Sequence, residues 1–360
     1  MVIWGLIMWV QIFQVRQLLR DNINNIFDFI EGEGRNFMSA GFLQKSSKKK
    51  DEWNSFVDKS PQGSVFCYYE WLKFSTYDDF EILVYVENND IIGGMPLPFY
   101  STNKIKLPAL TQKMGVLFQD FSHLKYAKKF EKEKKIIYSF LDILEANKIS
   151  YNMNFDWHFD NWLPFYWRGY EQTSRYTYII DFNEKNCDLI WQDMDQHKRK
   201  SIRKAQKNHL NIYETDDIEE FYNFNKNTFK RQNLKIPYSF NYLENLYNSF
   251  KENIKIYKAI DCNKNVHAIN FYIRDNKSVY YLMSGFDPNY RASGAQDFIQ
   301  WEAINYYCDK VKYFDFEGSM IESIESNFRK FGAVQKQYFR ICKKNIMNKI
   351  KDIVKIIFNI

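Results

Sequence analysis

The clearest chemical signal in the sequence is a run of basic residues, HKRKSIRKAQKNHL, inside a segment predicted to be helical over residues 193–209. Four of its cations recur at spacings of three and four, so they share one helix face: Lys200, Arg203, Lys204 and Lys207. Like charges on one face repel each other, so the cluster predicts an anionic partner: the diphosphate of a nucleotide-linked compound, a tRNA backbone or an acidic glycan. The alternative is a solvated face without a ligand.

Two carboxylates form a second candidate group. Asp315 and Glu317 lie two residues apart in KYFDFEG, a segment predicted to be a strand. Side chains two apart on a strand point to the same side, so both should face one surface where the strand ends at Gly318. The alternative role for Glu317 is to cap the turn at Gly318 and Ser319.

Metal and disulfide chemistry are not indicated. The cysteines are scattered, with no C-x-x-C pair, and the histidines are equally dispersed; the cysteines are Cys67, Cys187, Cys262, Cys308 and Cys342. Such spacing suits neither a disulfide framework nor a zinc site. We therefore expect reduced thiols, a cytoplasmic protein and no metal.

Composition indicates a globular protein of two domains. The chain has 360 residues, and its 50 basic and 44 acidic residues leave a net charge of +6, too little for a protein that packages nucleic acid. Aromatic residues make up 19% of the chain, which predicts either a stacking surface or ordinary core positions. Most fall in predicted strands and are assigned to the core, but the cluster at 157–170 lies between the two units and could wall a cleft.

The elements that must position these residues follow an α/β order. A first unit contains a hairpin at residues 82–86 and 91–95, a helix at 127–147 and a strand at 152–159. A second unit repeats the order helix, antiparallel strands, helix, strand. Its predicted helices are 193–209, 217–228, 241–252, 293–309 and 322–331, and its strands are 176–182, 253–261, 268–275, 278–286, 312–318 and 335–341. A duplicated α/β domain with mixed sheets explains the repeated order.

The two ends of the chain stand apart from these units. Residues 1–15 carry no charge, and the glycine- and glutamate-rich stretch 31–35 resembles a translated ribosome-binding site, so Met38 is predicted to be the true start. The alternative for this extension is a helix on a membrane surface. Residues 343–360 are predicted to form a basic amphipathic helix that packs on the preceding domain or docks on anionic lipid.

Several segments, taken in order, resemble a known group. They are WHFDNWLPFYWRGYEQTSRYTYIIDF, HKRKSIRKAQKNHLNIYE, FDPNYRASGAQDFIQWEAI and YFDFEGSMIESIESNFRKFGAVQKQYFRI. They resemble GNAT-fold acyltransferases related to the Fem-type aminoacyltransferases that build peptidoglycan cross-bridges. The resemblance spans about residues 50–342 and implies tandem GNAT-like domains at 48–160 and 161–342, between the extension 1–47 and the terminal helix 343–360.

The resemblance implies an enzyme that transfers an acyl or aminoacyl group to an amine of a cell-envelope precursor. The acceptor would be a nucleotide- or lipid-linked peptidoglycan peptide, or an amino sugar of a surface polysaccharide. The donor would be acyl-CoA or aminoacyl-tRNA, and the enzyme would be cytoplasmic or peripheral at the inner face of the membrane. The alternative is a non-catalytic GNAT-like module that binds an anionic polymer or nucleic acid.

GNAT enzymes hold the pyrophosphate of the donor at a helix N-terminus between two splayed strands, here 279–284 and 313–317. The corresponding loop supplies the candidate donor-binding residues Tyr290, Arg291, Ser293, Gly294 and Gln296. Arg291 and Gly294 fit the pattern R/Q-x-x-G-x-G/A, but Gln296 replaces its last small residue. That departure favours aminoacyl-tRNA or another activated acyl group over acetyl-CoA.

Three residues are candidates for the chemistry. Glu317 is the expected proton acceptor or amine anchor, and Tyr338 could donate a hydrogen bond to the leaving group or be a core tyrosine. In Fem-type proteins a lysine commonly precedes the Phe of a closing F-G pair by three residues. Phe328 occupies that position, so Arg329 is the substitute candidate, with a solvated helix charge as the alternative. His209, where the family has Gly, predicts an altered end of the basic helix.

Overall fold

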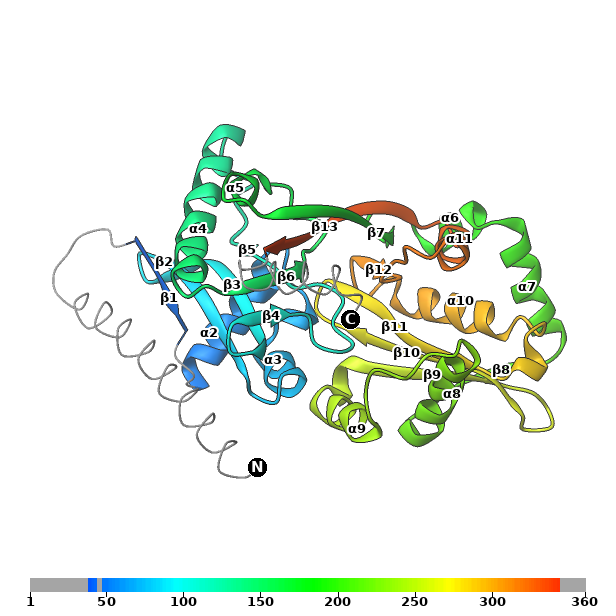
Figure 1. Ribbon diagram of the computed structural model, residues 1–360. Coiled ribbons are helices and arrows are strands. Elements are labelled where there is room, and N and C mark those ends of the chain that lie inside the picture. The colour runs from blue at the N-terminus through cyan, green and yellow to red at the C-terminus, as the bar shows by residue number, and fades with distance from the viewer. Residues whose placement is uncertain (1–37, 44–46, 344–360) are drawn as a thin grey trace, which may run out of the picture.

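The computed structural model describes residues 38–43 and 47–343 (Figure 1). The predicted extension before Met38 and the predicted helix after Lys343 lie outside these residues. Within the described ranges, no helix has the length and apolar character needed to cross a membrane.

The first unit, residues 38–181, contains the elements β1 to β7. Its helices are α2 (Ser47–Lys59), α3 (Tyr69–Ser75), α4 (Tyr126–Ala146) and α5 (Leu163–Trp167), with a 3-10 turn at Val65–Cys67. Its strands are β1 (Met38–Phe42), β2 (Phe80–Glu87), β3 (Asp90–Ser101), β4 (Lys104–Lys106), β5 (Leu117–Phe118), β6 (Ser150–Asn154) and β7 (Glu171–Asp181).

The second unit, residues 187–343, contains the elements α6 to β13. Its helices are α6 (Cys187–Asp193), α7 (Gln196–Lys207), α8 (Ile218–Arg231), α9 (Phe240–Ser249), α10 (Ala295–Tyr307) and α11 (Glu322–Arg329), with 3-10 turns at Lys251–Asn253 and Pro288–Tyr290. Its strands are β8 (Asn211–Thr215), β9 (Ile254–Ile260), β10 (Val266–Arg274), β11 (Ser278–Phe286), β12 (Tyr313–Asp315) and β13 (Val334–Lys343).

Local sequence explains the predicted elements that the structure contains. In α4 the apolar side chains recur at helical spacing and are buried: Ile136, Ile137, Phe140, Leu141 and Leu144. The predicted hairpin forms between β2 and β3. Asn88 and Asn89 both have positive φ, 53° and 69°, as the tight turns of such hairpins require.

One continuous mixed sheet joins the two units, with the strand order β1-β2-β3-β4-β6-β13-β7-β12-β11-β10-β9-β8. Helices cover both of its faces in Figure 1. Most neighbours are antiparallel, but β4 pairs with β6 and β11 pairs with β12 in parallel. The pairing of β11 with β12 covers only the pairs from Ser278 with Tyr313 to Tyr280 with Asp315. Beyond these pairs β12 ends at Asp315, while β11 continues to Phe286.

The two units repeat one topology and exchange their last strands. In each, helices precede three antiparallel strands, and then a helix, a parallel strand, a short helix and a final strand follow. The final strand of the first unit, β7, pairs with β12 of the second, and the final strand of the second, β13, pairs with β6 of the first. The exchange supports the predicted α/β fold with tandem GNAT-like domains. This repeat groups β7 with the first unit, whereas the boundary predicted at residue 160 would place it in the second, and that boundary remains a prediction.

Hydrogen bonds outside the sheet also hold the units together. The Nζ of Lys277, in the β10–β11 turn, donates to the carbonyl oxygen of Ser60 at 2.6 Å. The Asp275 carboxylate in the same turn accepts the backbone N–H of Val65 at 2.9 Å. The turn of the second unit is therefore anchored on the first.

Many of the aromatic residues in the described ranges are buried in the hydrophobic core, including Trp53, Trp71 and Phe155, and others pack against it. The aromatic cluster predicted at the junction, residues 157–170, includes both residues that contact the second unit and residues that are exposed. Trp157 contacts Tyr313 of β12, with ring centres 5.4 Å apart. Farther along, the Trp162 ring centre lies 6.4 Å from that of Phe339 of β13, and the Tyr170 ring centre lies 4.6 Å from Lys343 Nζ of the same strand, whereas Tyr166 and Trp167 are exposed.

Candidate functional site

The candidate site lies at the end of β12, beside β7 and β13. Asp315 ends β12, and the chain then turns through Glu317 and Gly318, whose φ values are +60° and +63°. A Cβ on Gly318 would lie 2.2 Å from the carbonyl oxygen of Tyr176, so glycine is required there by both conformation and space. The turn is held by Asp315, whose Oδ1 accepts the backbone N–H of Glu317 at 2.7 Å and the Thr177 hydroxyl at 2.6 Å.

The Glu317 side chain is buried without a partner. Its residue exposure is 9%, and neither carboxyl oxygen has a hydrogen-bond partner within the described ranges. Gln112 lies beside the carboxyl without reaching hydrogen-bond geometry. Loss of solvent, and then the nearby Asp315 carboxylate, hold the pKa of Glu317 well above its usual range, while Lys113 and Gln112 oppose the shift.

Lys113 supplies the positive charge of the site. It lies in the connection between β4 and β5, and its Nζ is 2.7 Å from Asp315 Oδ2 and 3.0 Å from Asp156 Oδ2. The same Nζ lies 5.0 Å from the centre of the Tyr280 ring. Burial acts to lower the pKa of Lys113, but the two aspartates outweigh it and raise that pKa above its ordinary value. Lys113 is therefore a buried cation that joins an aspartate of each unit.

Asp156 extends the charged network toward the surface. Its Oδ1 contacts the His158 ring Nδ1 at 2.7 Å and accepts the backbone N–H of His158 at 2.9 Å. Burial alone would raise the pKa of Asp156, but Lys113 and His158 outweigh it and lower that pKa below its usual range. Asp156 is thus held as a carboxylate.

A small cavity of about 10 Å³ collects these groups, and its lining residues are Gln112, Lys113, Thr177, Asp315, Glu317 and Tyr338. Space of this size suits about one water-sized group. Two of the residues predicted from sequence, Glu317 and Tyr338, therefore meet at one cavity. Arg175 Nε donates to the Tyr338 hydroxyl at 3.3 Å. Burial raises the pKa of Tyr338, and the contact with Arg175 acts to lower it.

Arg329, the third predicted residue, does not line this cavity. It ends α11 with a side chain that is 61% exposed, and its Nε lies 2.9 Å from Glu325 Oε1. Glu325 also accepts the hydroxyl of Tyr178. The structure therefore places Arg329 in a surface ion pair.

The predicted donor loop precedes α10 in a compact conformation. The Tyr290 ring stacks on His267 with centres 3.8 Å apart, and Arg291 is exposed. The Ser293 hydroxyl accepts the backbone N–H of Ala295 at 3.3 Å. Gln296, at the position of the usual small residue, donates from Nε2 to the carbonyl oxygen of Gly285 at 3.0 Å. Gln296 therefore ties the loop to β11.

The basic helix α7 packs against this loop. Gly294 has φ +82°, and a Cβ there would lie 2.3 Å from the Ser201 carbonyl oxygen of α7. Lys204 Nζ donates to the Ala292 carbonyl oxygen at 2.7 Å. Lys198 of α7, which is buried, pairs with Asp297 in the first turn of α10. A protein carboxylate therefore already lies at the positive end of the α10 dipole.

The other predicted cations of α7 remain at the surface. Lys200, Arg203 and Lys207 are exposed, and Arg203 lies over the Trp191 ring at 5.5 Å. The prediction of an altered end at His209 is wrong. His209 has φ +56°, and the N–H groups of His209 and Leu210 bond back to the carbonyls of Gln206 and Ala205, the usual pattern of a left-handed helix end.

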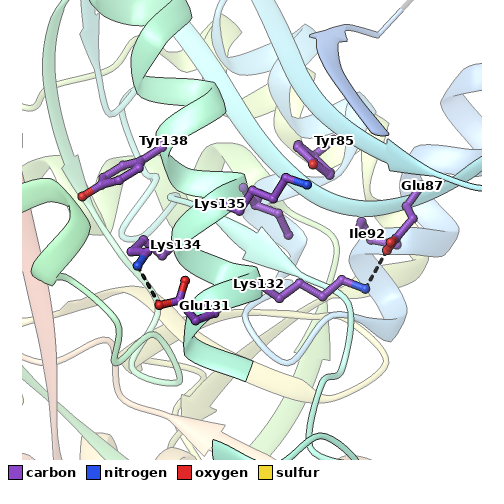
Figure 2. A pocket seen from close by; sticks show the side chains of 9 residues that line it. Tyr85, Glu87, Ile92, Glu131, Lys132, Lys134, Lys135 and Tyr138 are labelled. Atoms are coloured by element: carbon purple, nitrogen blue, oxygen red, sulfur yellow. Dashed lines mark hydrogen bonds and ion pairs between the residues drawn. The ribbon is translucent and has the colours of Figure 1, made fainter. Parts of the chain in front are cut away.

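A larger hollow of about 500 Å³ lies elsewhere, between α4 and the β2–β3 hairpin (Figure 2). Its floor includes Tyr85 and Ile136, and Lys132 at its rim pairs with Glu87 at 2.6 Å. It holds no buried carboxylate without a partner, so it does not compete with the Glu317 cavity as a catalytic site. Across the described part of the chain, no group of three His, Cys, Asp or Glu side chains could hold a metal ion.

Several residues of the site escaped sequence reasoning. Gln112 and Lys113 lie in TQKMGV, a segment with no periodicity to mark it, about 200 positions from Asp315. Asp156 carried a usable signal, because it is a single charge among the apolar residues of NFDWHF. An isolated charge in an apolar segment indicates a buried partner.

Comparison with known proteins shows which folds this architecture is similar to. Residues 194–322 match the family described as an acetyltransferase (GNAT) domain. The crystal structure of FemX aligns with a TM-score of 0.63 at 13% identity, over 83% of this chain and 96% of that one. No curated protein matches by sequence.

Two further structures are similar. The C-terminal domain of a putative lysylphosphatidylglycerol synthetase from Agrobacterium fabrum gives a TM-score of 0.50 at 9% identity, over 82% of this chain and 92% of that one. L-PGS from Bacillus licheniformis aligns with a TM-score of 0.51 at 8% identity, over 83% of this chain and 92% of that one. At these identities the likeness concerns the fold. The chain therefore has a tandem GNAT-like fold related to that of FemX, and its second unit contains the segment that matches the GNAT acetyltransferase domain.

Proposed function

We propose that the protein transfers an acyl or aminoacyl group to an amine of a cell-envelope precursor, either a peptidoglycan peptide or an amino sugar of a surface polysaccharide. The observation that carries the proposal is the Glu317 carboxyl, buried without a partner at the cavity beside the end of β12, a central strand of the GNAT-like unit. A buried carboxyl with a raised pKa is suited to receive the proton of an attacking amine near neutral pH.

The chemistry needs few protein groups. The amine nitrogen attacks the carbonyl carbon of the donor, the new C–N bond forms, and the bond from that carbon to the leaving oxygen or sulfur breaks. Glu317 takes the proton from nitrogen, and the leaving group receives a proton in turn. The Tyr338 hydroxyl at the same cavity is the hydrogen-bond donor proposed for that leaving group.

Two observations support an anionic, envelope-related substrate. The exposed cations of α7 lie beside the loop that precedes α10, as a nucleotide-linked or lipid-linked acceptor would require. The similar structures include FemX and a putative lysylphosphatidylglycerol synthetase. Gln296 at the end of the loop pattern favours aminoacyl-tRNA over acyl-CoA as the donor. The proposed location is the cytoplasm or the inner face of the membrane.

A transfer assay tests the proposal. The purified protein is incubated with labelled aminoacyl-tRNA or labelled acyl-CoA, and with nucleotide-linked muropeptides or amino sugars as acceptors. Transfer of label from one donor class to an acceptor amine is expected. If no label moves with any pair while bulk tRNA binds in a salt-sensitive manner, the proposal is wrong and the chain is a binding module.

A further inference from the structure

The charge balance of the Glu317 cluster lacks one cation. Lys113 contributes one positive charge, and it is shared between Asp156 and Asp315, at 3.0 and 2.7 Å. These groups already sum to one negative charge. An ionised Glu317 would add a second negative charge, in a place with little water, where neither of its carboxyl oxygens accepts a hydrogen bond. Such a carboxylate is strongly disfavoured unless a cation comes beside it.

The cavity beside Glu317 limits what that cation can be. Its volume is about 10 Å³, and its walls carry the amide of Gln112 and the hydroxyls of Thr177 and Tyr338. An ammonium group is close to water in size, so it fits this space, whereas a guanidinium group does not. The wall groups offer oxygen atoms that can accept its N–H bonds.

We infer that this cavity binds the substrate amine as an ammonium ion, and that Glu317 gives up its own proton to solvent when the ammonium arrives. The inference rests on the proposed function and adds to it the protonation state in which the acceptor binds. It also predicts a preference for a primary amine at the end of a slender chain, since a ring carbon would not enter the cavity.

The proton count balances. Before binding, Glu317 is a neutral carboxylic acid and the amine in solution carries one positive charge. After binding, the pair is a carboxylate and an ammonium, and one proton has gone to solvent. The carboxylate then takes a proton from the ammonium nitrogen, which leaves a neutral amine for attack and restores the acid.

The groups that face Glu317 come from both units. Asp315 raises the pKa of Glu317 and Lys113 lowers it. Tyr338 faces it from β13 beside Arg175, and Asp156 lies behind Lys113 with His158. Lys113 is already shared between two aspartates, and Arg175 makes its contact with the Tyr338 hydroxyl and not with the Glu317 carboxyl. The neutral acid is therefore the resting form.

Calorimetric titration in two buffers of different ionisation enthalpy counts the protons released on binding. The probe is Nα-acetyl-lysine amide, and the control is Nα-acetyl-norleucine amide, which has a side chain of similar length but no amine. Near neutral pH the lysine probe should bind with release of about one proton, and the norleucine probe should bind at least tenfold more weakly. Infrared difference spectra should show the loss of a protonated carboxyl band on binding.

Matched variants assign the proton. Glu317→Gln should abolish both the proton release and the infrared band. Glu302→Gln should leave both unchanged, since Glu302 is a carboxyl whose pKa is also raised by burial but which does not line the cavity. The inference would be overturned if the lysine probe did not bind, bound without proton release, or bound no more tightly than the norleucine probe. Proton release that persists in Glu317→Gln would also overturn it. Transferase activity without proton release would overturn this inference and leave the proposed function standing. Proton release without transferase activity would support this inference and contradict the proposed function.

Discussion

The carboxylate of Asp315 accepts the backbone N–H of Glu317 at 2.7 Å, so one acidic residue fixes the backbone of the other. Sequence reasoning had allowed Glu317 itself to cap this turn. Because Asp315 takes that role, the Glu317 carboxyl is left directed into the cavity without a partner. The hydrogen bond from the Glu317 backbone N–H to Asp315 explains how Glu317, which is not glycine, is held in a left-handed conformation at the centre of the site.

Replacement of Lys113 tests the network that supports this turn. Lys113→Met removes the cation shared by Asp156 and Asp315, which leaves the buried Asp315 carboxylate without a cation and Asp156 with only the His158 ring beside it. We expect a loss of about 3–5 kcal/mol in the free energy of unfolding, measured by urea denaturation. Lys132→Met, which breaks the more exposed pair with Glu87, should cost less than about 1 kcal/mol. Equal costs for the two variants would show that the Lys113 network is not a support of the fold.

Glu317→Gln should stabilise the protein while it impairs function. The pKa of Glu317 is raised in the folded state, so between the unfolded value, about 4.3, and the folded value, the folded state binds the extra proton. Stability of the wild-type protein therefore falls as pH rises through that window, and the amide escapes this loss. A gain of about 1–3 kcal/mol is expected near pH 7, vanishing below about pH 4. Urea denaturation at several pH values measures it, and a gain that is independent of pH would contradict the assignment.

His209→Gly should stabilise the end of α7. His209 adopts a left-handed conformation that costs a side-chain-bearing residue about 1 kcal/mol, and glycine adopts it freely. A gain of about 1 kcal/mol in unfolding free energy is therefore expected by thermal or urea denaturation. Asn208→Gly serves as the control, because Asn208 has φ −83° and should give no gain. Equal effects at the two positions would refute the explanation.

The exposed cations of α7 should govern substrate affinity more than turnover. A double variant, Lys200→Gln with Lys207→Gln, removes two exposed charges. Its KM for the nucleotide-linked or tRNA substrate should rise roughly three- to tenfold, with kcat little changed and the effect smaller at high salt. Lys230→Gln on α8 is the control for a general loss of surface charge. If the control matches the double variant, or if KM stays constant, the basic face does not contact the substrate.

Periodic patterns predicted most of the fold. The apolar spacing of α4, the hairpin around Asn88 and the strands β9 to β11 follow from local preference and burial. The exchange of β7 and β13 could not be predicted in this way, because each strand has the same pattern whether it pairs within its own unit or with the other. Pairing partners are a property of the whole sheet.

The site was predictable only in part, for a similar reason. Glu317 could be found because a carboxylate beside a glycine at a strand end is unusual, and the resemblance added Tyr338. Lys113 could not, since its importance comes from contact with Asp315 across about 200 positions. The prediction of an altered helix end at His209 was wrong because it assumed that a left-handed helix end needs glycine. Glycine is the common residue there, but other residues adopt that conformation at a modest cost.

The most direct measurement of the central claim compares transfer rates of Glu317→Gln and Glu302→Gln in the labelled-donor assay with the wild-type protein. The account predicts that the wild-type protein and Glu302→Gln transfer the label at similar rates, while Glu317→Gln is slower in kcat by about 100-fold or more, the usual effect of losing a proton acceptor. Glu317→Gln is expected to remain folded, so the loss would not reflect unfolding. Equal rates for Glu317→Gln and the wild-type protein would contradict the account.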